Sequence, residues 1–294
     1  MKYAWIKNHK DLFPIVTMCR VLGVSQSGYY KSFSATPSPR QLRHQRICQS
    51  IYQVYAQSHG NYGSHKVARQ MQADPQLESA CRNTVARAMR EMGLKSRISG
   101  TFKPTTTQAD SSKQPADNLL NQVFTADRPN QKWVTDITYL PTLAGWVYLA
   151  VVMDLFGRKV VGWSISTSLA TPLVSQALRQ AIEHRRCQMA GLLHHSDRGC
   201  QYTSEDYQST LKTLGITCSM SRRGCCYDNA AMERFFWTLK QEWTKFESYA
   251  DIEHARLSVF KFIETYYHSQ RLHQSLGYQT PNDFESNYYV KLAA

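Results

Sequence analysis

The sequence lacks the long apolar runs and the paired cysteines that mark membrane-spanning and secreted proteins. No stretch approaches the roughly 18 apolar residues that a bilayer span requires, and the longest apolar run, Trp146 to Met153, is no longer than a strand. The first ten residues hold no apolar segment of signal-peptide length. The eight cysteines are scattered and form no Cys-x-x-Cys, which argues against a cysteine-based zinc site and a disulfide framework. We therefore expect a cytoplasmic protein with reduced thiols and no membrane span.

Acidic residues are scarce in the first part of the chain. Residues 1–115 contain 17 Lys and Arg against 5 Asp and Glu, whereas residues 116–294 contain 18 against 17. Nearly all of the net charge of +13 therefore belongs to the front of the chain. A polycationic segment followed by a nearly neutral one indicates that the front binds a nucleic acid or an anionic membrane surface.

Two helical segments are predicted in this basic part. Within residues 11–33 apolar side chains recur at roughly helical spacing, and the glycine turn and serine cap at 22–30 are typical of a helix-turn-helix. They are equally typical of a generic two-helix corner. We place this N-terminal helical segment at 1–36, before a linker that contains prolines. The second segment, 40–97, is predicted to be a helical DNA-binding domain.

The last helix of the second segment is the candidate recognition helix. Asn83 is its predicted N-cap and Gly93 its predicted stop. Its exposed face carries Arg87 and Arg90. A basic helix face is usually only solvated, but this one follows two helices in the polycationic part, which favours a role in reading DNA.

The pattern of the sequence changes after the helical part. Ser, Thr, Pro and Lys predominate at 98–122, which is predicted to be a basic flexible linker. Strands are then predicted at 133–140, 145–154 and 159–165. They are followed by a helix at 172–187, a strand at 192–196, a helix after 205, a strand near 216–218 and a long helix after 229. Three antiparallel strands before alternating helices and strands is the order of a ribonuclease-H-like α/β fold. We place this catalytic core with its C-terminal helices at 123–282 and a tail at 283–294.

Three carboxylates lie where such a fold brings its strands and its long helix together. Asp136 is inside the first strand, Asp197 directly follows the fourth, and Glu233 is in the first turn of the long helix. Phosphodiester chemistry needs such a cluster, because two Mg²⁺ ions about 4 Å apart activate the attacking oxygen and stabilise the leaving oxygen. Mg²⁺ prefers carboxylate oxygens. We expect two Mg²⁺ (or Mn²⁺) ions, with Asp136 as the bridge between them.

Each carboxylate also has an ordinary structural interpretation. Aspartate is disfavoured in strands, which favours a functional role for Asp136. Taken alone, Asp197 suits a turn, and Glu233 suits the positive end of a helix dipole. Their joint placement favours catalysis. Asp154 is the competing carboxylate, and its position before a hairpin favours a role in the turn.

Four motifs of the chain, in this order, resemble one protein family. They are Trp133-x-x-Asp136-Ile137-Thr138, His195-Ser196-Asp197-Arg198-Gly199-x-Gln201-Tyr202-x-Ser204, Tyr227-Asp228-Asn229-Ala230-x-x-Glu233-x-Phe235-Phe236-x-x-Leu239-Lys240 and Tyr267-x-x-x-Arg271-x-His273-x-x-Leu276-Gly277-Tyr278-x-Thr280-Pro281. The sequence resembles the DDE transposases of bacterial insertion sequences, in particular the second-reading-frame protein of the "insertion sequence three" family, whose core is similar to retroviral integrases. The resemblance covers nearly the whole chain.

The resemblance implies an integrase-type core and assigns roles to its residues. Asp136, Asp197 and Glu233 are the expected ligands of the Mg²⁺ pair. Lys240 lies two helical turns after Glu233, where it is expected to contact a DNA phosphate near the scissile bond; the alternative is an ordinary surface lysine. The other expected DNA contacts are Arg198, Gln201, Tyr202, Arg222 and Arg223.

For several further side chains a structural role is expected or remains an alternative to a functional one. His195 either supports a metal ligand or packs in the core. Arg271 and His273 are either structural or bind DNA. The tryptophans near the site are expected to fill the core rather than stack on bases; they are Trp133, Trp146 and Trp163.

The resemblance implies a transposase that uses water, and then a liberated 3′-hydroxyl, to attack phosphodiester bonds without a covalent protein intermediate. In this family one element end is joined to the other to give a circular intermediate, and frameshifting fuses the chain to an upstream-frame protein. The expected partners are terminal inverted repeats, target DNA, further copies of the chain and that upstream-frame partner, near the bacterial nucleoid. Two alternatives remain: an inactive DNA-binding regulator derived from a transposase, and a ribonuclease-H-type nuclease.

Overall fold

The computed structural model describes residues 1–33, 37–75, 77, 80–97, 116–186, 188–223 and 225–293. Most of the linker predicted at 98–122 lies outside these residues. The chain divides into two compact units, Met1–Tyr52 and Gln53–Ala294, and each is described by itself. Among the described helices, none has both the length and the hydropathy needed to cross a membrane.

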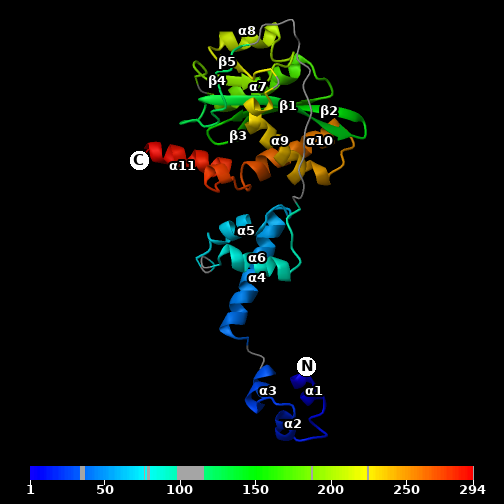
Figure 1. Ribbon diagram of the computed structural model, residues 1–294. Helices are drawn as coiled ribbons and strands as arrows, with labels where there is room; N and C mark the ends of the chain where they lie inside the picture. The colour runs from blue at the N-terminus through cyan, green and yellow to red at the C-terminus, as the bar shows by residue number, and fades with distance from the viewer. Residues whose placement is uncertain are drawn as a thin grey trace. The chain divides into compact units, whose positions relative to one another are not determined.

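The first unit is made of helices (Figure 1), and three of them enclose a small apolar centre. The helices are α1 (Lys2–Asn8), α2 (Ile15–Val21), α3 (Gln26–Ser32) and the first part of α4 (Pro39–Gln57). The centre contains Ile6, Met18, Cys19 and Tyr29. Ser25 caps α3, since its Oγ accepts a hydrogen bond from the N–H of Gly28 at 3.0 Å. The helical pair predicted at 11–33 is confirmed, and α1 adds a helix to it.

The second unit begins with the end of α4 and two more helices, α5 (Ser64–Met71) and α6 (Arg82–Glu91), which we call the helical module (residues 53–97). Helix α6 begins two residues earlier than the predicted N-cap implies. Its N-cap is Cys81, whose backbone is extended, so Asn83 lies inside the helix and the predicted cap is wrong. Gly93 ends the helix as predicted, with a φ of +69° that glycine adopts without strain. Arg87 and Arg90 are exposed on this helix.

A five-stranded sheet forms the centre of the second unit, in the order β3-β2-β1-β4-β5. The strands are β1 (Lys132–Thr142), β2 (Gly145–Asp154), β3 (Lys159–Ser166), β4 (Leu193–Ser196) and β5 (Thr217–Met220). The first three are antiparallel, whereas β4 runs parallel to β1 and β5 parallel to β4. This is the ribonuclease-H-like arrangement that the sequence predicts.

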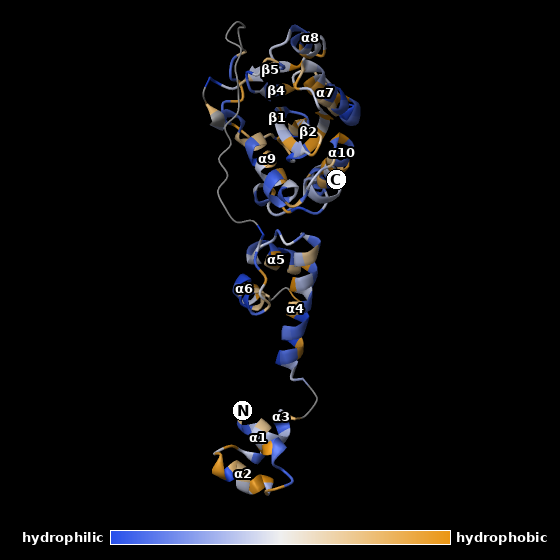
Figure 2. Ribbon diagram, turned by 90° about the vertical axis from the view of Figure 1, so that its right-hand side faces the viewer, coloured by the Kyte–Doolittle hydropathy of each residue, from blue (hydrophilic) through white to orange (hydrophobic). Residues whose placement is uncertain are grey.

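Helices cover both faces of the sheet, as Figure 1 shows. The elements on one face are α7 (Thr171–Arg185) and α8 (Glu205–Thr213); those on the other are α9 (Ala230–Glu242), α10 (Ile252–Phe260) and a π-helical turn (Lys261–Tyr267). Alternate residues of β2 serve the two layers: Val151 and Met153 pack toward α9, and Ala150 and Val152 toward α7. Each fully buried large apolar side chain contributes about 1.5–3 kcal/mol. The flanking helices carry both hydrophobic and hydrophilic residues in Figure 2, as expected of helices buried on one side.

Helix α7 approaches the sheet closely because β3 contains Gly162. A Cβ at this position would overlap the carbonyl oxygen of Ala177 and the backbone of Ala181. The absence of a side chain therefore lets helix and strand backbones come into contact. Any larger residue here would push α7 away from the layer that it covers.

The tryptophan predictions are partly wrong. Trp133 is fully buried, as expected, and Trp163 is half-buried. Trp146 is 55% exposed. It lies opposite Pro141 beside the β1–β2 turn, where the first residues of β2 are exposed. Its ring packs edge to face with Tyr139 at a centroid distance of 5.1 Å.

The predicted tail belongs to the folded core. Helix α11 (Pro281–Ala293) includes all the described residues after 282. Its buried Glu285 forms ion pairs with Arg185 on α7 and, at 3.3 Å, with Lys159 on β3. These contacts join the C-terminal helix to the sheet layer, so the boundary between 282 and 283 falls inside a packed element.

Candidate active site at the central strands

Asp136 lies in the middle of β1, the central strand. Its backbone pairs with Val151 on β2, and Val134 pairs with His195 on β4. One carboxylate oxygen of Asp136 accepts a hydrogen bond from the N–H of Ile137 at 2.7 Å. The first of the three predicted carboxylates is therefore fixed on the most constrained part of the sheet.

The parallel register of β1 and β4 brings Asp197 next to Asp136. The paired residues Val134 and His195 each lie two positions before one of these aspartates. Asp197 accepts a hydrogen bond from the N–H of Gly199 at 2.9 Å, which closes a tight turn after β4. A Cβ on Gly199 would stand only 3.0 Å from the same carboxylate oxygen, so a larger residue here would require the Asp197 side chain to shift.

Glu233 lies in the first turn of α9, as predicted. The helix start is fixed against β1 by Asn229, a buried residue whose Nδ2 donates to the carbonyl oxygen of Thr135 at 3.1 Å. Because Thr135 precedes Asp136, this bond sets the distance between the helix and the first carboxylate. Sequence reasoning did not assign Asn229 a role, although an Asp-Asn pair before a helix is a capping signal.

The electrostatics show that the three carboxylates share one neighbourhood. Burial raises the pKa of the Asp136 carboxyl well above its usual value, and the charges of Asp197 and Glu233 raise it further. The hydrogen bond from Ile137 and the ammonium of Lys240 lower this pKa. Burial also raises the pKa of Glu233. The structure thus brings together all three predicted carboxylates, with Lys240 beside them.

Lys240 is held at the edge of this acidic group. Its Nζ lies 4.5 Å from the centre of the Tyr139 ring, a cation–π contact. Burial lowers the pKa of its ammonium, and the charge of Asp136 opposes that shift. The exposed aromatic pair of Tyr139 and Trp146 therefore extends the site from Lys240 toward the β1–β2 turn.

His195 is buried in a hydrogen-bond network and does not face the carboxylates as a ligand. Its Nδ1 lies 2.8 Å from the hydroxyl of Ser219 and its Nε2 3.1 Å from that of Ser221. The Ser219 oxygen already accepts the N–H groups of Leu119 and Leu120. Its proton is therefore directed to Nδ1, and Nε2–H donates to Ser221. Burial lowers the pKa of His195 to about 4, so the ring is neutral and joins β4 to β5.

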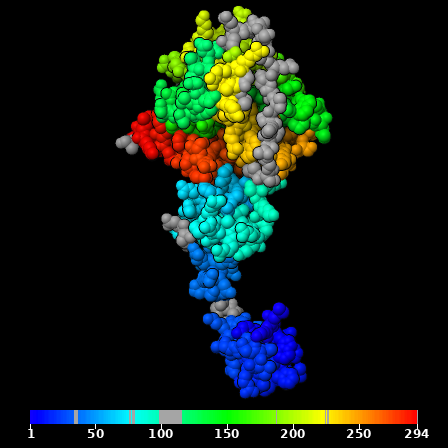
Figure 3. Space-filling view, viewed as in Figure 1, coloured from blue at the N-terminus to red at the C-terminus, as the bar shows by residue number. Residues whose placement is uncertain are grey.

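A charged clasp holds the segment between β5 and α9. The buried carboxylate of Asp228 accepts the backbone N–H of Arg222 at 2.8 Å, its Nε at 3.1 Å and its Nη2 at 2.9 Å. Gln122 donates to the same carboxylate at 2.9 Å. The Arg222 guanidinium, chiefly by hydrogen bonding, holds the pKa of Asp228 well below its usual range. In Figure 3 this segment (yellow) lies on the surface of the second unit that faces the viewer.

Two of the predicted DNA contacts are buried. Tyr202 is 1% exposed, and its hydroxyl donates to the Thr135 hydroxyl at 3.2 Å, since that hydroxyl itself donates to Val151. Gln201 is buried with its amide on the carbonyl oxygen of Leu169 at 2.8 Å. The expectation that Gln201 and Tyr202 line a DNA groove is therefore corrected. Both side chains support β1 and the turn after β4 from within.

The remaining predicted DNA contacts reach the surface to different degrees. Arg198 is half-buried, and its Nε donates to the carbonyl oxygen of Ser221 at 2.7 Å. Arg222 and Arg223 are exposed near the start of α9. Arg222 is partly engaged with Asp228, as described above.

Asp154 has the turn role predicted for it. It accepts a hydrogen bond from the N–H of Phe156 at 3.0 Å inside the β2–β3 turn. Its other oxygen accepts the N–H of Asn130 at 2.8 Å and lies 3.3 Å from Arg185. Asp154 pairs with Trp133 in the sheet register, away from Asp136, and does not belong to the acidic group.

In the part of the chain that the structure describes, no three His, Cys, Asp or Glu side chains are close enough to hold one ion together. The negative charges of Asp197 and Glu233 both act on Asp136, so Asp136 is common to the pairs Asp136–Asp197 and Asp136–Glu233. Partly buried carboxylate oxygens are the donors that Mg²⁺ prefers.

Three family descriptions match the sequence. An integrase core domain matches residues 126–226, and a second integrase core domain matches residues 214–281. An HTH-like domain matches residues 43–102. The two core matches contain all three carboxylates, and the third contains α5 and α6.

Similar proteins are found over nearly the whole chain. The transposase InsF for insertion sequence IS3A of Escherichia coli strain K12 is 40% identical over 288 residues, which cover 97% of this chain and 99% of that one. The transposase for insertion sequence element IS904 of Lactococcus lactis subsp. lactis strain IL1403 is 39% identical over 250 residues, 85% of this chain and 97% of that one. Among solved structures, the HTLV-2 integrase catalytic core domain in complex with magnesium (trimeric form) is 17% identical, with a TM-score of 0.42 over 54% of this chain and 99% of that one.

Proposed function

Because the chain belongs to the insertion-sequence transposases of the IS3 type, we propose that Asp136, Asp197 and Glu233 form its catalytic centre. As a transposase, the protein is a polynucleotidyl transferase that acts on the phosphodiester bonds of DNA. The assignment is supported by the strand register that brings Asp197 next to Asp136, and by the hydrogen bond from Asn229 to Thr135 that fixes the start of α9, where Glu233 lies, against β1. A group of anions held together in this way needs cations.

We assign two Mg²⁺ ions, or Mn²⁺, to the carboxylate pairs that share Asp136. When bound, such ions activate the attacking oxygen and stabilise the leaving oxygen of an in-line displacement. The fixed position of Asp136 on β1, of Asp197 in its turn and of Glu233 on α9 presets the spacing of these pairs. Lys240 supplies a further positive charge, which we assign to a DNA phosphate next to the scissile bond.

The same residues serve two successive displacements. In the first, a water oxygen forms a bond to phosphorus while the bond to the 3′-oxygen of the element end breaks, which liberates a 3′-hydroxyl. In the second, that hydroxyl loses its proton, attacks a phosphorus atom of the recipient strand and expels a 3′-oxygen there. The number of phosphodiester bonds is conserved in the second step, so joining needs no further energy source. No protein nucleophile takes part.

The helical part is assigned to DNA binding. The HTH-like domain contains α6, whose exposed Arg87 and Arg90 are suited to phosphate or base contacts. Arg198, Arg222 and Arg223 are assigned to DNA near the active site. We further propose that copies of the chain assemble on paired element ends and that an upstream-frame protein joins them, as a partner or as a fusion.

The substitution Asp136→Asn tests the catalytic assignment. It removes one negative charge at nearly constant size, so we expect loss of Mg²⁺-dependent cleavage and joining of end-containing DNA, while DNA binding persists. Asp206→Asn is the matched control, because Asp206 is an exposed aspartate in the first turn of α8. Full activity of Asp136→Asn would contradict the assignment.

Two outcomes would favour the alternatives. If the wild-type protein neither cleaves nor joins end-containing DNA, even with its upstream-frame partner, the chain is a DNA-binding regulator. If it hydrolyses RNA–DNA hybrids and does not join strands, it is a ribonuclease-H-type nuclease. Gel analysis of labelled substrates distinguishes cleavage, joining and hybrid hydrolysis in one experiment.

A further inference from the structure

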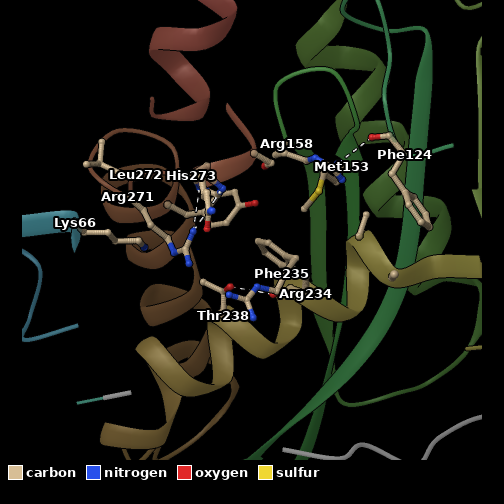
Figure 4. Close-up of a pocket in the computed structure, with 15 residues that line it drawn as sticks. Lys66, Phe124, Met153, Arg158, Arg234, Phe235, Thr238, Arg271, Leu272 and His273 are labelled. Carbon is tan, nitrogen blue, oxygen red and sulfur yellow. Dashed lines mark hydrogen bonds between the residues drawn. The ribbon is translucent and has the colours of Figure 1, made fainter. Parts of the chain in front are cut away.

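A basic cavity lies beside the active site, on the neighbouring face of α9 (Figure 4). Its volume is about 680 Å³, within the roughly 300–1,000 Å³ typical of ligand sites. It belongs to the second unit, and Lys66, Arg158, Arg234 and Arg271 contribute to its walls. Arg234 follows Glu233 directly, so the two side chains diverge by about 100° around the helix axis.

The four cations come from elements far apart in the sequence. Lys66 belongs to α5 of the helical module, Arg158 to the β2–β3 turn and Arg234 to α9, while Arg271 follows the π-helical turn. Figure 4 shows the side chains of Lys66 and Arg271 pointing toward each other, while Arg158 is directed toward Phe124. The fold therefore collects positive charge at a point where the helical module meets the catalytic core.

Most of this charge is uncompensated. Arg271 forms a two-point ion pair with Glu242, with Nε–Oε2 and Nη2–Oε1 distances of 2.7 Å. No carboxylate among the described residues forms an ion pair with Lys66, Arg158 or Arg234. The charge of Glu242 also acts on Lys66 and Arg234, so a single carboxylate is shared among three cations, while Arg158 has no ion pair with a described carboxylate.

Each of the three cations is nevertheless held in place. Arg158 donates from Nη2 to the carbonyl oxygen of Phe124 at 2.9 Å. The Lys66 ammonium lies 4.8 Å from the centre of the Tyr62 ring. The Arg234 guanidinium stacks on its neighbour Trp237 at 4.2 Å. Because these contacts already restrict the side chains, binding an anion would cost less side-chain entropy.

The cations also destabilise one another. Burial lowers the pKa of Lys66 to about 8, and the charges of Arg271 and Arg234 lower it further, whereas Glu242 opposes the shift. A bound anion would relieve the repulsion, because it supplies the missing counter-charge in a partly desolvated place.

We propose that this cavity binds a backbone phosphate of the DNA strand that passes from the helical module to the active site. Guanidinium groups and a lysine ammonium are the donors that recognise phosphate oxygens. DNA is the favoured source of the phosphate, because Lys66 belongs to the HTH-like domain and Arg234 follows a proposed catalytic carboxylate. The inference rests on the proposed function, since it concerns the same DNA strand.

A scan with neutral phosphates tests the proposal. Duplexes of the element end carry one methylphosphonate each, at successive linkages, and their affinity is measured by fluorescence anisotropy for the full-length protein and for Lys66→Gln/Arg234→Gln. A charge-assisted contact is worth about tenfold in affinity. We expect the wild-type protein to lose about this factor at one linkage or two adjacent ones, and the double variant to show little loss there. The single variant Arg234→Gln, at an exposed position, repeats the test with minimal risk to folding.

The matched control is Lys212→Gln/Arg179→Gln. It removes the same two charges from exposed positions on α8 and α7, outside the cavity. We expect each methylphosphonate to change the affinity of this control variant as it changes that of the wild-type protein. The proposal is overturned if the cavity variants respond to every methylphosphonate as the wild-type protein does. It is also overturned if inorganic phosphate raises the melting temperature of the wild-type protein alone while the DNA scans coincide, since the cavity then holds free phosphate.

The experiments distinguish a failure of the cavity assignment from a failure of the catalytic assignment. Asp136→Asn is expected to retain the wild-type scan while it loses strand joining. An active Asp136→Asn protein with an unchanged scan would reject the catalytic centre and leave the cavity assignment standing. A cavity variant without linkage specificity would reject the cavity assignment and leave the catalytic centre standing.

Discussion

Arg271 holds Glu242 by two hydrogen bonds of 2.7 Å at the end of the helix that begins with the active site. Both side chains are buried. Tyr266 donates to the same carboxylate at 2.9 Å, and Asn61 of the helical module donates to the carbonyl oxygen of Glu242 at 2.9 Å. One residue therefore joins α9, the C-terminal part of the core and the helical module.

The first prediction concerns the stability of this junction. Glu242→Gln leaves the buried guanidinium of Arg271 without its counter-charge, so we expect the free energy of unfolding to fall by about 3–5 kcal/mol. Urea denaturation measures it. The control is Glu253→Gln, which breaks an exposed pair with Arg256 at 3.4 Å and should cost less than about 1 kcal/mol. Equal losses in both variants would contradict the importance of the buried pair.

The second prediction concerns the clasp of Asp228 with Arg222. Asp228→Asn removes the charge that accepts three hydrogen bonds from Arg222, which loosens the segment before Glu233. We expect the rate of strand joining to fall by about tenfold, with the Kd for end-containing DNA nearly unchanged. Single-turnover kinetics and anisotropy measure the two quantities. Asp206→Asn serves again as the control, and a normal joining rate in Asp228→Asn would show that the clasp does not position Glu233.

Much of the core could be predicted from the sequence because its signals are local. The β-branched and aromatic residues in 133–165 predict three strands, and Asp136 stands out as a charged residue within one of them. The register of β1 and β4 then explains why Asp197 reaches Asp136. These features depend on neighbours within one element or on the order of elements, which the sequence displays.

Other features depend on contacts between distant segments and could not be predicted in the same way. Tyr202 is close to Asp197 in the motif, but its hydroxyl bonds with Thr135 in the interior. Trp146 is a large apolar residue of the kind that fills cores, yet it lies beside the β1–β2 turn and is 55% exposed. The sequence leaves Arg271 open between a structural role and DNA binding, because its partner Glu242 comes from another helix.

The last prediction concerns acid stability and His194. Burial lowers the pKa of this fully buried histidine from 6.5 to about 3. Between these values the unfolded chain binds a proton that the folded protein does not, so stability from His194 is present above pH 6.5 and is lost as the pH falls toward 3. The slope for one such proton is about 1.4 kcal/mol per pH unit. The raised pKa of Asp154, about 6, gives the opposite slope between pH 3.8 and 6, which partly masks the effect in the wild-type protein.

A difference measurement isolates the histidine. His194→Gln keeps a neutral polar group near the hydroxyl of Tyr207, which lies 3.1 Å from Nε2 of His194. We subtract the free energy of unfolding of the variant from that of the wild-type protein. This difference should decrease by about 1.4 kcal/mol for each unit by which the pH falls from 6 to 4, whatever the absolute stability of the variant. Urea denaturation at several pH values measures this difference. A constant difference for His194→Gln would show that the buried ring takes up its proton in the folded protein as readily as in the unfolded chain.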